Sequence, residues 1–454
     1  MPTLCHPIIV VPGILASYLR NDYPLPPTYP WTVLTNDFPA IQLHPNDTRY
    51  EAREPARIVG DQVFEIAYKD LIHTLRRDLR PDNFESLSEA VKVAISDSGE
   101  LPEVPVYPFG YDWRQPLELQ VDRLADFIDE VIARTALMKE YRADGYTVDN
   151  GKVHLVGHSM GGLIIAGLIH KKLSGNAFDG QTIAQVGKVV TVATPFGGSF
   201  QAIVHMLTGQ AMTEGYPAAD RDASRLTPAL YYLLPFAIWK DGDLTNVAAW
   251  QPSILASISE AVRVAGLTPL DQCERVAAEL FAHLVRRGFA FQEKLRTLGQ
   301  FGSQPWLDRN WLAILGVNAE TRISMRKDGA NNFILDQHAV QNRFGAAKTW
   351  EEAQLTGDST VPYLGALPPF LGRDKLVLVT PQDFGNWEWR DSLLTARIGF
   401  HGMIPNMNMV QRLLVRFFKD SRTKFNNTWG RQAPGISITD WNPPLQLRHA
   451  DRPS

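Results

Sequence analysis

Cysteine is scarce in this chain, which has 454 residues and only two cysteines, Cys5 and Cys273. So few thiols cannot form a disulfide framework or a thiol-rich zinc site, and their scarcity fits a reducing compartment. The opening sequence lacks the basic start of a signal peptide, and Pro12 and Gly13 interrupt its apolar run. No apolar stretch approaches the roughly 18 residues of a membrane span. These absences predict a cytoplasmic protein without a transmembrane segment. Export without a cleavable signal and transient contact with a membrane surface stay open as alternatives.

An excess of charge of either sign is also missing. The chain has 45 basic and 49 acidic residues and a formal net charge of −4, so its charge gives no reason to expect nucleic acid as a partner. Hydrophobic residues make up 44% of the chain and charged residues 21%, which are ordinary values for a globular protein with a substantial core. The length favours one large elaborated domain, or a core with a cap. The sequence does not indicate the oligomeric state.

Short apolar runs alternate with amphipathic helical patterns through most of the chain. Strands are predicted at 7–11, 104–107, 153–156, 186–193, 311–317 and 375–380, with a further strand-like piece at 111–114. Helices are predicted at 68–80, 117–138, 160–173 and 407–418. Continuous apolar strands are typical of a sheet that is buried on both faces, and alternation with helices favours parallel pairing. The sequence therefore predicts an α/β fold with a mostly parallel central sheet flanked by helices.

Two segments interrupt this alternation. Residues 20–60 are rich in Pro, Asn, Asp and Tyr and show no clear periodicity, so we expect a long loop excursion there. Residues 200–305 contain helical patterns, including 252–264 and 272–297, and no obvious strand. They are expected to form a largely helical cap insertion. The predicted order is core, cap and core, at residues 1–199, 200–305 and 306–454.

A G-x-S-x-G pentapeptide at residues 157–161 points to a nucleophile. An apolar strand ends at Val156 and a helix-compatible run begins at Met160, which is the strand–turn–helix setting of the nucleophile elbow in the α/β-hydrolase fold. Bulky neighbours would clash on so tight a turn, which explains the glycines on both sides and at Gly162. Ser159 is therefore the predicted nucleophile. The alternative is a glycine-rich turn with an incidental serine.

A serine nucleophile needs a base, and the base needs an orienting acid. In this fold they follow in the order Ser, Asp/Glu, His. Asp358 comes after the later strands and just before a turn, and His401 lies between the last predicted strand and the last helix. These two residues are the predicted acid and base. Each also has a plain structural alternative, as an Asx-turn aspartate and a loop histidine.

Other candidates for these roles fit less well. His449 lies in a polar tail, where we expect it to be solvated. His158 adjoins the nucleophile and cannot easily turn back to it, so we expect it to pack or hydrogen-bond locally. Weaker alternatives for the acid are Glu351, Glu352 and Asp336.

The tetrahedral intermediate of acyl transfer needs two backbone N–H donors. One normally comes from the residue after the nucleophile, and the other from the loop after an early strand. Met160 is the first predicted donor. Ile14 is the second, because the turn at residues 12–15 follows the first strand and Gly13 lets its backbone approach the oxygen. The alternative is that this Pro-Gly pair merely turns the chain.

Several motifs together resemble one family. In chain order they are HPIIVVPGIL at 6–15, YDWR at 111–114, GHSMGG at 157–162, ATPFGGS at 193–199, TPALYYLLP at 227–235 and GDSTVP at 357–362. The set resembles the lecithin:cholesterol acyltransferase and phospholipid:diacylglycerol acyltransferase group, with its lysosomal phospholipase relatives. The resemblance implies a triad of Ser159, Asp358 and His401, and an oxyanion hole of the Ile14 and Met160 amides. It also implies lipid acyl esters as substrates.

The chain departs from this family in places. Secreted animal members have a disulfide-closed lid loop in the early excursion, whereas residues 20–60 contain no cysteine. Trp31, with Val33 and Leu34, could form an apolar lid or pack on its own domain. Asp112 and Arg114 are interpreted as a structural ion pair near the sheet edge. An aromatic group is expected to build the cap core, with contact to an acyl chain as the alternative; it comprises Tyr231, Tyr232, Phe236 and Trp239.

The predicted function is a lipase, esterase or phospholipase that forms an acyl-enzyme and needs no metal or organic cofactor. An O-acyltransferase that passes the acyl group to an alcohol uses the same chemistry. It differs in whether the site excludes water. A non-catalytic binding protein on a hydrolase scaffold is the alternative from another class. The sequence names neither the acyl chain nor the head group of the substrate.

Overall fold

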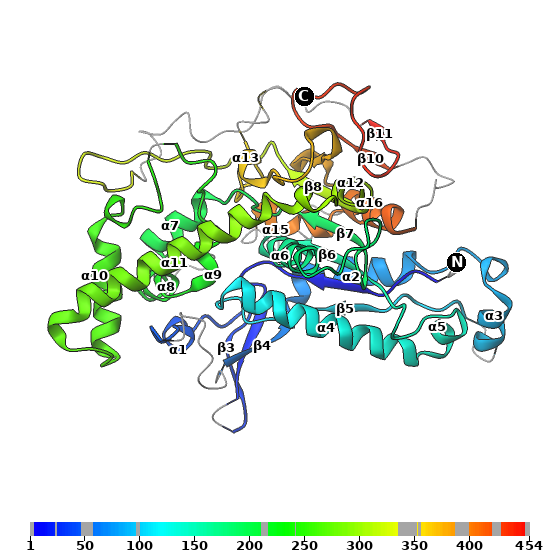
Figure 1. Cartoon of the computed structure of the whole chain (residues 1–454), viewed down its shortest axis with the longest axis horizontal. Helices are drawn as coiled ribbons and strands as arrows, with labels where there is room; N and C mark the ends of the chain where they lie inside the picture. The colour runs from blue at the N-terminus through cyan, green and yellow to red at the C-terminus, as the bar shows by residue number, and fades with distance from the viewer. Residues whose placement is uncertain are drawn as a thin grey trace.

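The fold is built around a six-stranded sheet (Figure 1). The computed structural model describes residues 4–22, 25–46, 58–96, 100–209, 217–240, 242–334, 352, 356–385, 399–419 and 428–449. The strands of the sheet lie in the order β5-β1-β6-β7-β8-β9, and every neighbouring pair is parallel. They are β1 (Ile8–Val11), β5 (Val106–Pro108), β6 (Val153–His158), β7 (Val186–Val192), β8 (Trp311–Gly316) and β9 (Val377–Val379). The predicted parallel α/β sheet is confirmed.

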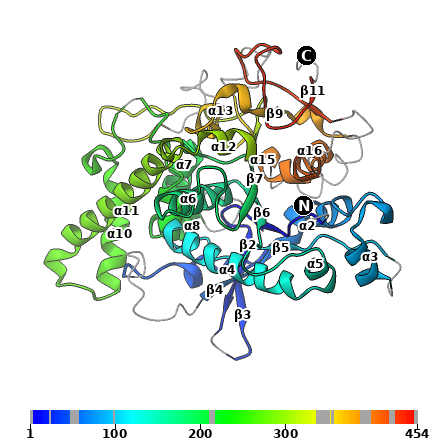
Figure 2. The same ribbon diagram turned by 45° about the vertical axis from the view of Figure 1, so that its right-hand side comes forward.

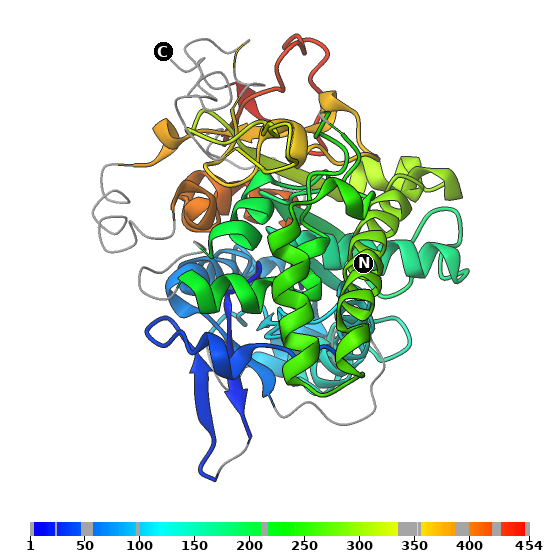
Figure 3. The ribbon, with the colours of Figure 1, turned by 90° about the vertical axis from the view of Figure 1, so that its left-hand side faces the viewer.

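Several strands of the sheet are buried along their whole length. All residues of β1, β6 and β8 are buried, because helices cover both faces of the sheet, as parallel sheets require. Figure 3 shows the blue and orange helices α2 (Glu65–Asp78) and α16 (Asn408–Lys419) on one side of it. On the other side α4 (Leu117–Leu137) packs on α6 (Met160–Ser174). The helices predicted from apolar spacing are therefore present.

Residues 20–60 were predicted as a loop, and that prediction was only partly right. They contribute to a second, antiparallel sheet of β2 (Ser17–Asn21), β3 (Thr28–Trp31) and β4 (Ile58–Val63), which projects from the body (Figure 2). A four-residue helix, α1 (Phe38–Ile41), follows β3. The strands were missed because they are short and largely half-buried or exposed, so they lack clear alternation. The strand-like piece at 111–114 is also not a strand but turns toward α4.

The segment at 200–305 is helical in its described part. It contains α7 (Phe200–Thr208), α8 (Pro217–Arg225), α9 (Pro228–Tyr231), α10 (Pro252–Val264) and α11 (Cys273–Leu295), and α12 (Gln304–Asn310) follows. No strand is assigned within 200–209, 217–240 or 242–305. Tyr231 and Tyr232 are fully buried here, so these aromatics form core, as expected. The division into core and cap stays a prediction.

Short elements complete the chain. The helices are α3 (Glu89–Ile95), α5 (Lys139–Ala143), α13 (Tyr363–Ala366) and α15 (Gly399–Met403). The strands are β10 (Trp429–Gly430) and β11 (Arg448–His449), which pair with each other. Among the described residues, no helix has the length and apolar character needed to cross a membrane.

Asp112 and Arg114 form the structural ion pair that was predicted beside the sheet edge. Arg114 donates Nε and Nη2 to the two oxygens of Asp112, at 2.8 and 2.7 Å. Its Nη1 donates to the carbonyl of Ile41 at 2.7 Å. The two side chains are only 3% and 2% exposed. The pair therefore ties the end of the β5 loop to α1, far from any solvent that could replace a lost partner.

Arg114→Met is expected to lower the free energy of unfolding by about 3–5 kcal/mol, because it leaves a buried carboxylate without its partner. Urea unfolding curves measure this change. The control is Arg77→Met, since the Arg77–Asp78 pair has side chains 54% and 39% exposed and should contribute at most about 1 kcal/mol. Equal, small losses for both variants would contradict a structural role for the buried pair.

Candidate active site

Ser159 lies on a strained turn between β6 and α6. Its backbone has φ 52° and ψ −127°, a positive φ that a non-glycine residue adopts only where its surroundings enforce it. A Cβ on Gly157 would lie 2.7 Å from the Cα of Gly162, and a Cβ on Gly162 would lie 1.9 Å from Oγ1 of Thr194. The strand and the helix can meet this closely only through glycine. The turn therefore has the geometry of a nucleophile elbow, with Ser159 at the N-terminus of α6.

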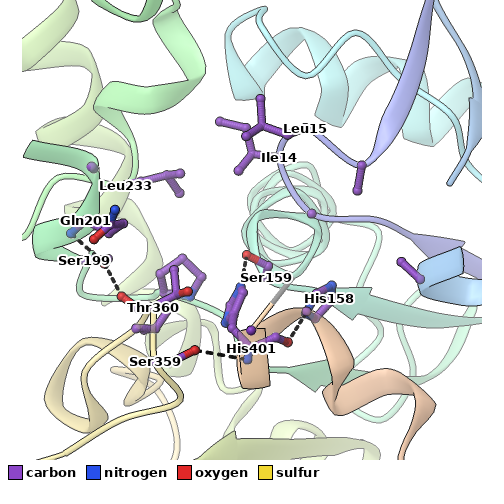
Figure 4. A pocket seen from close by; sticks show the side chains of 18 of the residues that line it. Ile14, Leu15, His158, Ser159, Ser199, Gln201, Leu233, Ser359, Thr360 and His401 are labelled. Carbon is purple, nitrogen blue, oxygen red and sulfur yellow. Dashed lines mark hydrogen bonds between the residues drawn. The ribbon is translucent and has the colours of Figure 1, made fainter. Parts of the chain in front are cut away.

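The structure brings the three predicted triad residues together. His401 Nε2 lies 2.9 Å from Ser159 Oγ (Figure 4). His401 Nδ1 lies 2.7 Å from Asp358 Oδ2. The other oxygen of Asp358 accepts hydrogen bonds from the amides of Thr360 and Val361, at 3.0 and 2.7 Å. An ionised carboxylate only accepts hydrogen bonds, so it fixes the proton of His401 on Nδ1. Nε2 then presents its lone pair to the serine hydroxyl.

Of the weaker candidates for the acid, the structure describes only Glu352. Glu352 is exposed, whereas Asp358 is 1% exposed. Glu351 and Asp336 lie outside the described residues, as does the side chain of His449. The base lies in a short helix, α15, rather than in the loop that was expected. The sequence order of acid and base therefore matches the observed hydrogen-bonded chain.

A cavity of about 390 Å³ opens beside Ser159 and His401. Its walls are largely apolar, with Ile14 and Leu15 on one side and Leu233 on the other (Figure 4). Cavities of this size and character are typical of small-molecule sites. None of the four aromatics predicted for the cap core is among the described residues that line it. The cavity has room for a lipid-like group next to the serine.

The turn after β1 lies close to Ser159. A Cβ on Gly13 would lie 3.0 Å from the Cβ of Ser159, so glycine is needed for the approach that the sequence predicted. Leu15 has φ 66°. Trp31 donates from Nε1 to the carbonyl of Leu15 at 2.9 Å and is 3% exposed. Trp31 therefore packs on its own domain and supports this turn, while Leu34 is 92% exposed.

Tyr68 and His158 link this turn to the backbone of His401. The amide of Gly13 donates to Tyr68 Oη at 2.9 Å, and Tyr68 Oη lies 2.8 Å from His158 Nδ1. His158 Nε2 lies 3.0 Å from the carbonyl oxygen of His401. Because that carbonyl only accepts, His158 carries its proton on Nε2, and Tyr68 donates to Nδ1. The Gly13 amide is therefore engaged, which leaves Ile14 and Met160 as the predicted oxyanion donors.

His158 was expected to bond locally, and the structure shows a longer reach. It connects the turn after β1, through Tyr68 on α2, with the backbone of α15. Burial lowers the pKa of His158 to about 3, so the ring is neutral in the folded protein. Only the position of His158 next to the nucleophile hinted at this role in the sequence, and nothing pointed to Tyr68.

Tyr68→Phe is expected to lower kcat/KM for ester substrates about tenfold, a change of about 1.4 kcal/mol. Removal of the hydroxyl leaves the Gly13 amide and His158 Nδ1 without their partner, and the turn shifts relative to Ser159. A buried polar group without its hydrogen bond costs about 1–3 kcal/mol. Tyr141→Phe is the control, because Tyr141 is buried and donates to the carbonyl of Cys5 at 2.8 Å, away from the cavity. Equal kcat/KM losses in both variants would argue against a positioning role.

Acid should destabilise the fold through His158. Its pKa is about 3 in the folded chain and about 6.5 when unfolded, so between these values the unfolded chain binds one more proton. Stability therefore falls as pH decreases through this window, by up to about 1.4 kcal/mol per pH unit from this residue. Urea unfolding from pH 7 to pH 5 measures the slope, which should be flatter in His158→Gln. An unchanged slope would contradict a neutral buried His158.

No group of three His, Cys, Asp or Glu side chains arranged to hold a metal ion occurs in the part of the chain that the structure describes. Cys5 and Cys273 are not joined in a disulfide.

Comparison with known proteins bears on this geometry. Residues 87–266 match the family model described as Lecithin:cholesterol acyltransferase. This segment of the chain is similar to that family. The matched segment includes Ser159 but ends before Asp358 and His401. The match supports an acyl-transferring or hydrolytic enzyme that acts on lipids, and no curated protein matches the sequence.

A solved structure has a similar fold. This chain is similar to a chain of the structure titled "The crystal structure of Tle4-Tli4 complex", with a TM-score of 0.52 and 14% sequence identity. The likeness covers 80% of this chain and 89% of that chain. At this identity it bears on the fold alone, and it agrees with the α/β-hydrolase architecture of the parallel sheet.

Proposed function

We propose that this chain is a serine ester hydrolase or acyltransferase that acts on lipid-like carboxylic esters through an acyl-enzyme at Ser159. The observation that carries the proposal is the hydrogen-bonded chain from Asp358 through His401 to Ser159, at the wall of a largely apolar cavity. The family match supports the lipid character of the substrate.

The proposed reaction has two steps. His401 Nε2 takes the proton of Ser159 as Oγ attacks the ester carbonyl, and Asp358 stabilises the imidazolium. The amides of Ile14 and Met160 bind the oxyanion. The alcohol leaves with the proton from His401, and the acyl group stays on Ser159. Water or a second alcohol then attacks the acyl-enzyme while His401 accepts its proton. The bond between the acyl carbon and Ser159 Oγ breaks, and His401 returns the proton to Oγ.

Hydrolysis and acyl transfer differ only in the acceptor. The apolar walls of the cavity favour an acyl chain beside Ser159, and they also limit water. An O-acyltransferase is therefore the second candidate. A non-catalytic binding protein is disfavoured by the hydrogen-bonded Ser159, whose strained backbone would serve no purpose in it.

One experiment tests the nucleophile and identifies the acyl group. The purified protein is incubated with a lipid mixture and quenched in acid, and mass spectrometry seeks an acyl adduct on the peptide that contains Ser159. A labelled acyl donor with and without a competing alcohol then distinguishes a free fatty acid from a new ester. Absence of both an adduct and any Ser159-dependent product would overturn the proposal.

A further inference from the structure

A second histidine–aspartate pair lies at the cavity that holds Ser159. His205 on α7 has its Nε2 2.6 Å from Oδ1 of Asp220 on α8. The Ser224 hydroxyl donates to the backbone carbonyl of Asp220 at 2.7 Å and lies 3.1 Å from the same carboxylate oxygen. His205 is 8% exposed and Asp220 1%, yet His205 is among the residues that line the cavity. Nothing in the triad chemistry uses this pair.

The hydrogen bond to Asp220 leaves one ring nitrogen of His205 available. An ionised carboxylate only accepts, so Nε2 carries the proton and Nδ1 of the neutral ring presents a lone pair. No hydrogen bond to Nδ1 occurs within the described part of the chain, which includes the helix neighbours of His205. A polar atom in a nine-tenths buried ring at a cavity wall is suited to bind a ligand group.

The position of His205 is suited to bind another group of the substrate rather than the ester group that Ser159 would attack. Gln201 and Ala202 line the cavity on the same face of α7, four and three residues before His205. Ser199, at the N-cap of α7, donates to the carbonyl of Thr360 beside the acid loop. His205 therefore lies about 6 Å along the helix from Gln201, away from that loop.

The charge of the cavity indicates what the group is. Within the described residues, no Lys, Arg, Asp or Glu lines the cavity. The carboxylates of Asp220 and Asp358 lie behind their histidines, so the field in the cavity disfavours an anionic head group such as a phosphate. A neutral hydroxyl can donate to His205 Nδ1 without burying a charge.

We propose that His205, oriented by Asp220, accepts a hydrogen bond from a free hydroxyl of the substrate, and that the substrate is a partial acylglycerol or a similar hydroxyl-bearing lipid ester. This inference rests on the proposed function, because the ester must reach Ser159. His205 is then a specificity-determining residue that holds the alcohol part of the ester while the acyl chain lies along the apolar walls.

The test compares two esters of one fatty acid, 1-monooleoylglycerol and ethyl oleate, in the same detergent micelles. The wild type should prefer the hydroxyl-bearing ester in kcat/KM, and His205→Gln and His205→Leu should each lower that preference about tenfold, mainly through KM for monooleoylglycerol. The Gln NH₂ group can still donate to Asp220, but the Gln acceptor, Oε1, does not occupy the position of Nδ1. A purely structural pair predicts instead that His205→Gln keeps the wild-type preference.

Controls separate the possible outcomes. His170→Leu removes an imidazole hydrogen bond, to Thr297 Oγ1 at 3.1 Å, outside this cavity, and should leave the preference unchanged. Ser159 is labelled with a fluorophosphonate in each variant. Labelled enzyme with an unchanged preference overturns the inference alone, whereas absence of labelling and turnover in the wild type overturns the proposed function. A preference for oleoyl lysophosphatidate that His205→Gln removes would replace the hydroxyl by an anionic group and also overturn the inference.

Discussion

Ser159→Ala is expected to lower kcat for p-nitrophenyl ester hydrolysis by roughly 10⁴- to 10⁶-fold, the range found when the nucleophile of a serine triad is removed. The reason is chemical rather than structural. Alanine retains the Cβ that packs against Gly13 but has no oxygen to form the acyl-enzyme, so the base has no proton to take. Any remaining turnover would come from binding and the oxyanion donors alone.

Two measurements check this result. Initial rates of p-nitrophenyl butyrate hydrolysis give kcat, and a fluorophosphonate probe reports whether a nucleophile is present at all. Ser174→Ala is the matched control, because Ser174 is an exposed serine at the end of the same helix and donates to the carbonyl of Lys171. Rates within a few-fold of wild type in Ser159→Ala, with labelling retained, would place the nucleophile elsewhere.

The contrast between Ser159 and Tyr68 shows what the sequence could predict. The nucleophile turn is encoded locally, since an apolar strand, a G-x-S-x-G turn and a small-residue helix follow one another within a few residues. The order of Asp358 and His401 follows from the parallel sheet, whose strand ends gather at one edge. Tyr68 lies on an amphipathic helix that looks ordinary. Its hydroxyl matters only because the fold brings it to Gly13 and His158.

The same limit explains the other differences. Trp31 was open to two interpretations, as a lid or as core, because its bond to the carbonyl of Leu15 joins segments that only the folded chain brings together. The strands β2, β3 and β4 show only weak alternation of apolar and polar residues. Their structure therefore depends on pairing with one another rather than on a sequence pattern. His205 and Asp220 are common residue types in helical segments. Only their 2.6 Å contact at the cavity singles them out.

Asp358→Asn tests the acid of the triad, which was predicted only from its place in the order Ser, Asp/Glu, His. We expect kcat to fall by about 10⁴-fold, with little change in KM. The amide group has nearly the shape of the carboxyl group, and its oxygen can still accept from the amides of Thr360 and Val361. Its NH₂ group would then face His401 Nδ1 and donate to it, so the ring proton moves to Nε2. The base then has no lone pair for the hydroxyl of Ser159.

The measurements are kcat for a p-nitrophenyl ester and the rate of fluorophosphonate labelling, which should fall together because both need an activated Ser159. Glu352→Gln is the control, since this exposed carboxylate was a weaker candidate for the acid and should be dispensable. Glu351→Gln and Asp336→Asn extend the test to the other two candidates. If one of these variants lost activity while Asp358→Asn kept it, the acid would be misassigned. If only Asp358→Asn lost activity, the 2.7 Å contact between Asp358 and His401 would be the contact that orients the base. The reactivity of the Ser159 hydroxyl would then depend on the Asp358 carboxylate.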